Sequence, residues 1–298
     1  MVVVKIKDLP KEKYLLPGNT ACQGCPHALG LKALGMALGD RIVLIVPAGC
    51  TTIIAGSRDK SAFKFPCLHV PFASAPAVAT GLGSAFKRLG KDGIPVVWMG
   101  DGGSDIGFAT LSGACVRKDD MIVVVSDNEA YMNTGIQTSG TTFWKARTTT
   151  SPTGKREEKK DLALIMLMHK ADYVATASVG YLQDFIAKLK RASEIEGFRF
   201  IHLHSPCPPG WGFDSGETVE IARMAVKCGA WILWEFDGRF RISPQSKPYR
   251  DRDKRLPLAD YLRRQRRFRH LTNDDIVEIE KRIDEQWKVI LALENIFS

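Results

Sequence analysis

The chain has 298 residues, of which 45% are hydrophobic, so it can bury the core of one large domain or two small ones. It contains no run of about eighteen apolar residues, which argues against a transmembrane helix. Residues 1–18 lack the pattern of a secretion signal, and we therefore expect a cytoplasmic protein. The formal net charge of +9 makes nucleic-acid binding a function to consider.

Strands and helices alternate along the first part of the chain. Residues 1–18 form a mostly polar leader, and residues 51–61 are expected to be a loop or short helix. Short apolar runs predict strands, and longer runs with helical spacing predict helices. The predicted strands are 41–46, 67–70, 95–99 and 121–125, and the predicted helices are 29–38, 72–89 and 105–116.

The same alternation continues to about residue 236. Residues 141–161 are polar and show no hydrophobic period, which predicts an exposed loop. After this loop the predicted helices are 162–171, 182–196 and 218–228, and the predicted strands are 173–177, 198–203 and 231–236. The alternation predicts an α/β fold, with a mostly parallel sheet and helices on both faces. We place one domain at residues 1–238 and a C-terminal helical arm, facing a partner, at residues 239–298.

Basic side chains crowd into residues 239–270, which is the sequence feature most suggestive of nucleic-acid binding. The aromatic residues there, Tyr249, Tyr261 and Phe268, form no stacking pattern, and the region carries no nucleic-acid motif, so we expect a solvated or subunit-facing arm. Asn273, Asp274 and Asp275 form a good helix start. The apolar face of this final helix comprises Ile276, Ile279, Ile283, Trp287, Ile290 and Leu291.

Glycines and polar side chains follow two consecutive strands. Gly100-Asp101-Gly102-Gly103 comes directly after the first strand, and Asp127-Asn128-Glu129 follows the second. Parallel strands joined by a helix place both ends at one edge of the sheet, where ligands bind. Glycines allow close backbone approach, a helix N-terminus attracts phosphate, and carboxylate and amide oxygens suit Mg²⁺. A Mg²⁺–diphosphate site is predicted, although the glycines alone fit an ordinary turn with Asp101 as helix cap equally well.

Seven cysteines in an intracellular chain argue against disulfides. Cys22 and Cys25 form a CxxC, and Cys50 and Cys207 each follow a predicted strand. These four can hold zinc or an iron–sulfur cluster, and spacing alone does not separate the two metals. Cys115 and Cys228 lie in helical patterns and are expected in the core. Cys67 follows Pro66 in a loop-like stretch, which does not indicate whether its side chain is buried.

The GDG turn and the later loop DNEAYMNTGIQTSG resemble the motif of thiamine diphosphate enzymes. The loop is similar to that of the thiamine-binding β subunit of 2-oxoacid:ferredoxin oxidoreductases, the pyruvate synthase group. The resemblance implies a thiamine diphosphate-binding fold with Mg²⁺ on Asp101, the Asn128 side chain and the Ala130 carbonyl. It implies cofactor contacts from Gly100, Asp101, Gly102, Gly103, Ser104, Asn128, Asn133, Thr134 and Gly135. It also implies a [4Fe–4S] cluster on Cys22, Cys25, Cys50 and Cys207, because the segments CxGC, AGC and CPPGW match the family in context.

The resemblance implies a multi-subunit enzyme that oxidatively decarboxylates a 2-oxoacid to acyl-CoA and CO2 with coenzyme A as co-substrate. An α-type subunit would complete the thiamine site, γ-type and ferredoxin-like subunits would assemble with it, and ferredoxin or a similar acceptor would take the electrons. Pyruvate is the expected substrate. Many pyruvate-type relatives carry Glu-Asn where this chain has Ala73-Ser74, so a branched or aromatic 2-oxoacid such as phenylglyoxylate is the alternative.

Two residues are catalytic candidates. Asn133 lies in the loop DNEAYMNTGIQTSG, residues 127–140, which we call the cofactor loop, and His69 precedes the predicted helix over 72–89, which is rich in small residues. The other histidines near predicted strand ends, His27, His202 and His204, are more commonly hydrogen-bonded supporting residues than proton donors. Two rival functions stay open: a non-oxidative thiamine enzyme with a structural metal on the cysteines, and a basic iron–sulfur protein that binds nucleic acid. Neither rival explains the loop DNEAYMNTG.

Overall fold

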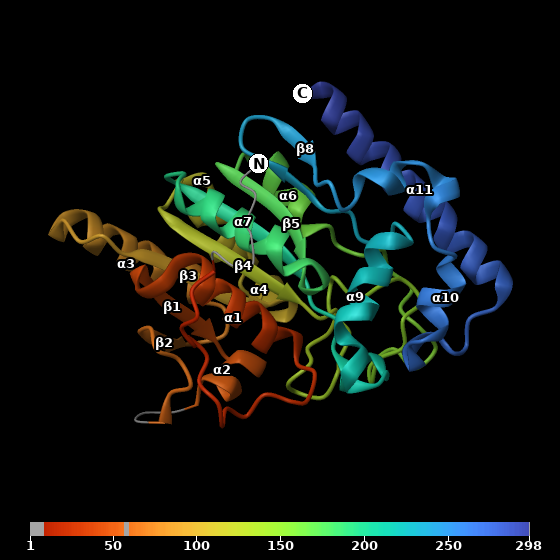
Figure 1. Cartoon of the computed structure of the whole chain (residues 1–298), viewed down its shortest axis with the longest axis horizontal. Coiled ribbons are helices and arrows are strands. Elements are labelled where there is room, and N and C mark those ends of the chain that lie inside the picture. The colour runs from red at the N-terminus through yellow and green to blue at the C-terminus, as the bar shows by residue number, and fades with distance from the viewer. Residues whose placement is uncertain (1–8, 57–59, 298) are drawn as a thin grey trace.

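The computed structural model describes residues 9–56 and 60–297, and within them the chain forms an eight-stranded sheet (Figure 1). The strand order is β2-β1-β3-β4-β6-β5-β7-β8. The first six strands in this order are parallel, while β7 and β8 pair antiparallel at one edge. The strands are β1 Ile42–Pro47, β2 Cys67–Val70, β3 Ile94–Gly100, β4 Met121–Asp127, β5 Tyr173–Ser178, β6 Phe198–His204, β7 Trp234–Phe236 and β8 Phe240–Ile242. The predicted, mostly parallel sheet is confirmed.

Helices cover both faces of the sheet because side chains alternate along each strand. In β3, Val96 and Trp98 pack with α1 (Pro26–Leu38) and α7 (Leu182–Ser193), whereas Val97 and Met99 belong to the core on the opposite face. That opposite core includes α3 (Ala75–Leu89), α5 (Phe108–Val116), α6 (Leu162–Met168) and α9 (Thr218–Lys227). The remaining helices are α2 Cys50–Ala55, α4 Asp101–Ile106, α8 Pro208–Trp211, α10 Leu258–Arg263 and α11 Asn273–Ile296. None of the described helices has the length and apolar content that crossing a membrane requires.

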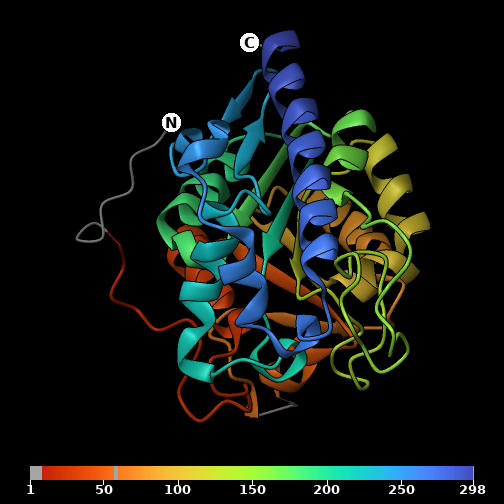
Figure 2. The ribbon, with the colours of Figure 1, turned by 90° about the vertical axis from the view of Figure 1, so that its right-hand side faces the viewer.

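The long helix α11 lies along one side of the molecule, far from α3 at the other side (Figures 1 and 2). A capping box begins it: the Thr272 hydroxyl accepts from the Asp275 backbone, and the Asp275 carboxylate accepts from the Thr272 backbone. Its buried residues, Ile276, Ile279, Ile283, Trp287, Ile290 and Leu293, pack into the chain's own core. The predicted helix start is confirmed; Leu291 is partly buried against this core as expected, and Leu293 is a buried residue that was not predicted.

The segment 141–161 is the largest correction to the sequence-based structure. As predicted, it is a loop without helix or strand, and residues 149–150, 152–153 and 156–158 are exposed, but Thr141, Thr142 and Ala146 are fully buried and Lys155 is nearly so. The Lys155 ammonium donates to the backbone carbonyls of residues 139, 140 and 142, which satisfies its hydrogen bonds away from water. A polar segment can therefore be buried without hydrophobic periodicity, because its side chains bond to backbone.

Several predicted elements differ in their extent, and two of these differences have an informative cause or consequence. The single helix expected over 105–116 is divided at Gly107 into α4 and α5. A Cβ at this position would lie 2.8 Å from the Gly103 carbonyl oxygen and 3.2 Å from that of Ala73, so only glycine fits there. The strand expected over 231–236 begins only at Trp234, and its antiparallel partner β8 was not predicted.

Candidate functional site

The carboxyl ends of β3 and β4 meet at the same edge of the sheet, as the sequence predicted. The two strands are paired in parallel, with Gly100 opposite Ser126. A cavity of about 320 Å³ opens there. Its walls combine the GDG turn and the cofactor loop with segments that follow β1 and precede α3: His27, Pro47, Ala48, Gly49, Cys50, Thr51, Phe72, Trp98, Gly100, Asp101, Gly102, Gly103, Asn128, Ala130, Tyr131, Met132, Asn133 and Thr134.

Three polar groups converge at the edge of this cavity. One terminal atom of the Asn128 amide lies 3.0 Å from Asp101 Oδ1 and 3.0 Å from the Ala130 carbonyl oxygen. This atom is the amide oxygen in one orientation, and it is the nitrogen, donating to both oxygens, when the amide is turned over. All three residues are buried. Adjacent ligands of an octahedral Mg²⁺, at about 2.1 Å from the ion, lie about 3.0 Å apart, so the first orientation suits a magnesium ion.

Asp101 also belongs to a buried carboxylate pair. The Thr141 hydroxyl lies 3.0 Å from Asp101 Oδ2 and 2.8 Å from Asp127 Oδ1, so it bridges the two carboxylates. Burial and the charge of Asp127 raise the pKa of Asp101 well above its usual range. A cation at this position would offset both effects by attraction to the ionised form.

Buried cations flank the cofactor loop. The Lys159 ammonium lies 2.5 Å from Glu129 Oε1, and Arg267 Nη1 donates to Glu129 Oε2 at 2.6 Å. Burial alone would raise the pKa of Asp127, but Lys159 and the His202 hydrogen bond at 2.8 Å lower it below its usual value. Glu129 has a φ of 60°, a left-handed conformation that non-glycine residues seldom adopt. The two cations hold this residue in place between Asn128 and Ala130.

A second cavity, of about 250 Å³, adjoins the first and is lined by Cys22, Cys25, Cys50 and Cys207. The two cavities share His27, Cys50, Asn128, Met132 and Asn133. Burial raises the pKa of Cys50 and of Cys207 to about 12, so both thiols are protonated in the metal-free chain, and binding of a metal centre would have to displace their protons. Within residues 9–56 and 60–297, no three His, Cys, Asp or Glu side chains are close enough to hold a single metal ion. Four cysteines spread around one cavity suit a polynuclear cluster better than a single ion.

Most of the residues that sequence analysis assigned to the cofactor line the first cavity. Ser104 and Gly135 are not in its wall; the Ser104 hydroxyl donates to the Asp101 carbonyl, and Gly135 adopts a φ of 126° in the loop. His69 is exposed on the edge strand β2, away from both cavities. Ala73 and Ser74 also lie outside the wall, which Phe72 alone of that segment joins, so their expected contact with substrate is not observed.

The three other cysteines lie away from the cysteine-lined cavity. Cys115 and Cys228 are buried in helical surroundings, which confirms them as core residues. Cys67 is half-buried at the start of β2, and burial raises the pKa of its thiol to about 11.

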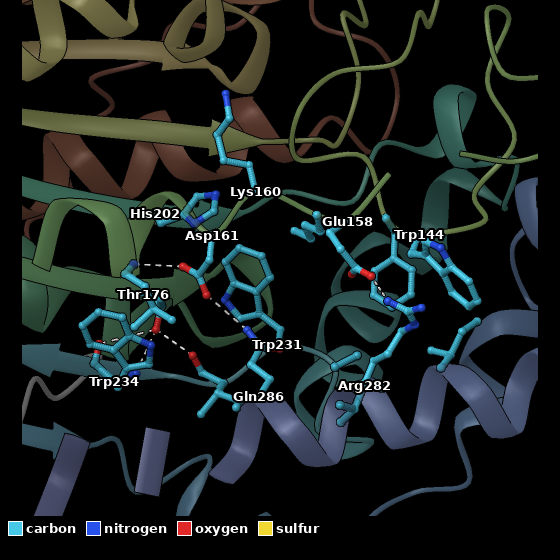
Figure 3. A pocket seen from close by; sticks show the side chains of 17 residues that line it. Trp144, Glu158, Lys160, Asp161, Thr176, His202, Trp231, Trp234, Arg282 and Gln286 are labelled. Carbon is cyan, nitrogen blue, oxygen red and sulfur yellow. Dashed lines mark hydrogen bonds and ion pairs between the residues drawn. The ribbon is translucent and has the colours of Figure 1, made fainter. Parts of the chain in front are cut away.

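A third cavity, of about 280 Å³, shares no wall residue with the first (Figure 3). His202, which bonds to Asp127, forms part of its wall together with Trp231 and Trp234. Its charged residues are already engaged: Lys159 with Glu129, Lys160 with Asp105, Arg282 with Glu158, and Asp161 with Gln286. These pairings leave no free charge among the named residues to bind a ligand in this cavity.

The basic region makes many internal ion pairs. Arg250 pairs with Glu294, Arg252 with Glu280 and Asp284, and Arg255 with Asp284, all on α11. Arg264 pairs with Glu217. These acidic partners neutralise part of the positive charge of residues 239–270. Fewer of the arginines there are therefore unpaired than the sequence suggested.

Comparison with known proteins bears directly on this site. A family model described as the thiamine pyrophosphate enzyme, C-terminal TPP binding domain, matches residues 47–203. The pyruvate synthase subunit PorB of Methanothermobacter thermautotrophicus is 44% identical over 93% of this chain and 96% of its own length. The ketoisovalerate oxidoreductase subunit VorB of Pyrococcus abyssi is 41% identical over 97% of this chain and 96% of its own length. The chain belongs to the β subunits of the 2-oxoacid:ferredoxin oxidoreductase family.

A solved structure of this enzyme family has the same fold. A chain of 2-oxoglutarate:ferredoxin oxidoreductase from Magnetococcus marinus, with 2-oxoglutarate, coenzyme A and succinyl-CoA bound, aligns with a TM-score of 0.59 and 27% identity. The alignment covers 72% of this β subunit and 82% of that chain. The family resemblance and the thiamine diphosphate-binding fold inferred from the sequence are confirmed.

Several residues that support the site were not assigned from the sequence. Phe72, Trp98 and Tyr131 form apolar walls of the first cavity, and Lys159 and Arg267 pair with Glu129. The three aromatic residues lie close in sequence to segments that the sequence analysis singled out. That proximity is the one sequence signal that could have assigned them to the cavity wall. The two cations carry no such local signal, because their partner is distant in sequence.

Proposed function

We propose that this β subunit carries thiamine diphosphate, Mg²⁺ and a [4Fe–4S] cluster in an enzyme that oxidatively decarboxylates a 2-oxoacid to acyl-CoA and CO2. The observation that carries the proposal is the convergence of the buried Asp101 carboxylate, Asn128 amide and Ala130 carbonyl beside the GDG turn, with the Asn128 amide 3.0 Å from each of the other two oxygens. These oxygens would hold Mg²⁺, which in turn would bind the diphosphate. Gly100, Gly102, Gly103, Asn133 and Thr134 line the adjoining cavity and would contact the cofactor.

The glycines fit this role in different ways. A Cβ at Gly100 would meet no atom within 4 Å, which leaves open space beside the strand end. A Cβ at Gly102 would lie 2.5 Å from the Tyr131 ring, so glycine lets the turn and the cofactor loop approach each other. When bound, thiamine diphosphate supplies the chemistry that releases CO2 from a 2-oxoacid, while the protein orients and shields it.

The cysteine-lined cavity supports an oxidative reaction. A [4Fe–4S] cluster there would accept the electrons, and the shared walls of the two cavities keep the donor and acceptor sites adjacent. The cluster would be held by Cys22, Cys25, Cys50 and Cys207. No other element of the described chain offers a comparable set of cysteines, so further electron transfer would pass to a partner chain and then to ferredoxin or a similar acceptor.

The substrate we propose first is pyruvate, and a branched-chain 2-oxoacid is the second candidate. Relatives named pyruvate synthase and ketoisovalerate oxidoreductase are almost equally similar to this chain, at 44% and 41% identity. The second candidate is favoured by the apolar rings of Phe72, Trp98 and Tyr131 in the cavity wall. Coenzyme A is the proposed acyl acceptor. An α-type subunit would complete the cavity, and γ-type and ferredoxin-like subunits would complete the enzyme, so the isolated chain would be inactive.

The test is anaerobic purification with partner subunits retained, followed by electron paramagnetic resonance while 2-oxoacids are added singly with coenzyme A. We expect one acid to reduce a [4Fe–4S] signal, and the reduction to require thiamine diphosphate. Zinc in place of iron would support the non-oxidative alternative. A cluster that no 2-oxoacid reduces would overturn the proposed reaction.

A further inference from the structure

His27 joins the two cavities without being assigned to either cofactor. It lies two residues after Cys25 at the start of α1, is 3% exposed, and lines both cavities. Its Nε2 lies 3.0 Å from Asn128 Nδ2. Its Nδ1 lies 3.3 Å from the Thr51 hydroxyl and 3.4 Å from the Trp98 indole nitrogen.

These contacts allow two arrangements of protons. In the first, His27 carries its proton on Nδ1 and donates to Thr51, while Nε2 accepts from the Asn128 amide. The Trp98 indole N–H then faces this proton and loses its acceptor on Nδ1. The Asn128 oxygen then points at Asp101 and Ala130, the geometry that needs a cation. In the second, Trp98 donates to Nδ1 and Nε2–H donates to the Asn128 oxygen. The Asn128 amide is then turned over, and its nitrogen donates to Asp101 and Ala130 at 3.0 Å.

The two arrangements differ in whether the cation site exists. In the second, the Asn128 nitrogen occupies the place of the ligand oxygen, so Mg²⁺ would meet hydrogen atoms there instead of a lone pair. In the first, an acceptor on His27 is what keeps the nitrogen on the far side of the amide. The orientation of one ligand thus depends on which nitrogen of one histidine is protonated.

We infer that His27 is a positioning residue, which holds the Asn128 oxygen toward Mg²⁺ by accepting a hydrogen bond from the Asn128 amide. This inference rests on the proposed function, because it presumes that Mg²⁺ binds with thiamine diphosphate. It assigns to residues 25–27 two tasks: Cys25 faces the cluster, and His27 sets a magnesium ligand. The Thr51 hydroxyl supports the required tautomer by accepting from Nδ1–H.

The test uses Mn²⁺ as a paramagnetic probe for Mg²⁺ in the enzyme complex saturated with thiamine diphosphate. Free Mn²⁺ is measured by electron paramagnetic resonance, and iron content reports whether the neighbouring cluster is intact. His27→Leu removes the acceptor, and we expect roughly tenfold weaker Mn²⁺ binding with unchanged iron. His27→Gln restores an acceptor oxygen, and we expect it to recover most of the affinity. Thr51→Val removes the support for the tautomer and should give a smaller loss.

The outcomes separate this inference from the function on which it rests. A wild-type complex that binds no Mn²⁺ with thiamine diphosphate would overturn the proposed function. Wild-type binding together with equally tight binding by His27→Leu would overturn only the role of His27. Equal losses in the Leu and Gln variants would also overturn it, since they would show that the shape of imidazole matters and not its acceptor. Should His27→Leu fail to fold, unchanged affinity in Thr51→Val would contradict the inference.

Discussion

Arg267 and Glu129 form a buried ion pair, with Nη1 and Oε2 2.6 Å apart, that fixes the C-terminal region to the cofactor loop. The guanidinium also lies 3.5 Å from the centre of the Trp211 ring. Trp211 in turn donates through its indole nitrogen to the Asn128 carbonyl at 2.8 Å. A residue of the basic region therefore supports both Glu129 and the backbone of Asn128, the proposed magnesium ligand next to it.

Replacing Arg267 with Met should destabilise the protein strongly. The change leaves Glu129 buried with Lys159 as its one remaining cation, and loss of one partner of a buried pair costs about 3 kcal/mol or more. Chemical unfolding measures the loss. The matched control is Arg263→Met on the same segment, where the side chain is exposed and a change within about 0.5 kcal/mol is expected. Equal effects of the two variants would contradict the importance of the pair.

The sequence predicted those parts of the site whose chemistry is local. The GDG turn, the loop DNEAYMNTG and the cysteine segments each place several chemically informative residues within a few positions, and the strand pattern places them at one sheet edge. Arg267 could not be assigned this way, because it lies 138 residues from Glu129 and the other arginines around it, Arg263, Arg264, Arg266 and Arg269, are exposed. Burial of an ion pair depends on tertiary contacts that no periodicity records.

The segment 141–161 also shows burial that the sequence pattern did not predict. Its threonines and lysines were predicted to be exposed because polar residues without a period are typical of loops. In the structure, Thr141 bridges two carboxylates and Lys155 donates to three carbonyls, so the segment exchanges water for internal partners. Whether such a side chain is buried depends on where other segments place carboxylates and carbonyls that need a donor. The polar sequence of the segment does not indicate their positions.

The ion pair between Lys145 and Asp275, which joins this segment to α11, should make stability depend on pH. The Lys145 contact and the Thr272 backbone lower the pKa of Asp275 to about 2, below the value of about 4 in an unfolded chain. A depressed pKa contributes stability above the unfolded value, and the contribution is lost as pH falls from about 4 to about 2. Asp275→Asn should remove about 1 kcal/mol at pH 6 and flatten the dependence in that range, whereas Asp274→Asn should not. Thermal unfolding between pH 2 and 6 distinguishes the two.

Removing one cluster cysteine should deplete iron without unfolding the chain. Cys207→Ser keeps a small side chain in a buried position of the cysteine-lined cavity, but serine is a poor ligand for iron. We expect the anaerobically purified complex to lose most of its iron and its [4Fe–4S] absorbance. Cys115→Ala is the matched control, since Cys115 is a buried core residue of α5 and does not line that cavity. The iron content of this variant should equal that of the wild type. Full iron in Cys207→Ser would remove Cys207 from the ligand set.

Gly100→Ala should separate cofactor binding from stability. The φ of −78° and ψ of 170° at Gly100 are ordinary for alanine, and the new Cβ would meet no protein atom within 4 Å. Because the residue lines the first cavity, this methyl group would occupy space that we assign to the cofactor. We expect unfolding free energy to stay constant or rise by up to about 1 kcal/mol, and thiamine diphosphate affinity to fall about tenfold.

The control for this substitution is Gly81→Ala, within α3. A Cβ there also meets no atom within 4 Å, and alanine is the better helix former by about 0.5–1 kcal/mol. It should raise stability and leave cofactor affinity unchanged, as calorimetric titration of the complex would measure. If Gly100→Ala bound thiamine diphosphate as tightly as wild type, the open space beside the strand end would not be where the cofactor lies. The glycine would then serve the turn alone.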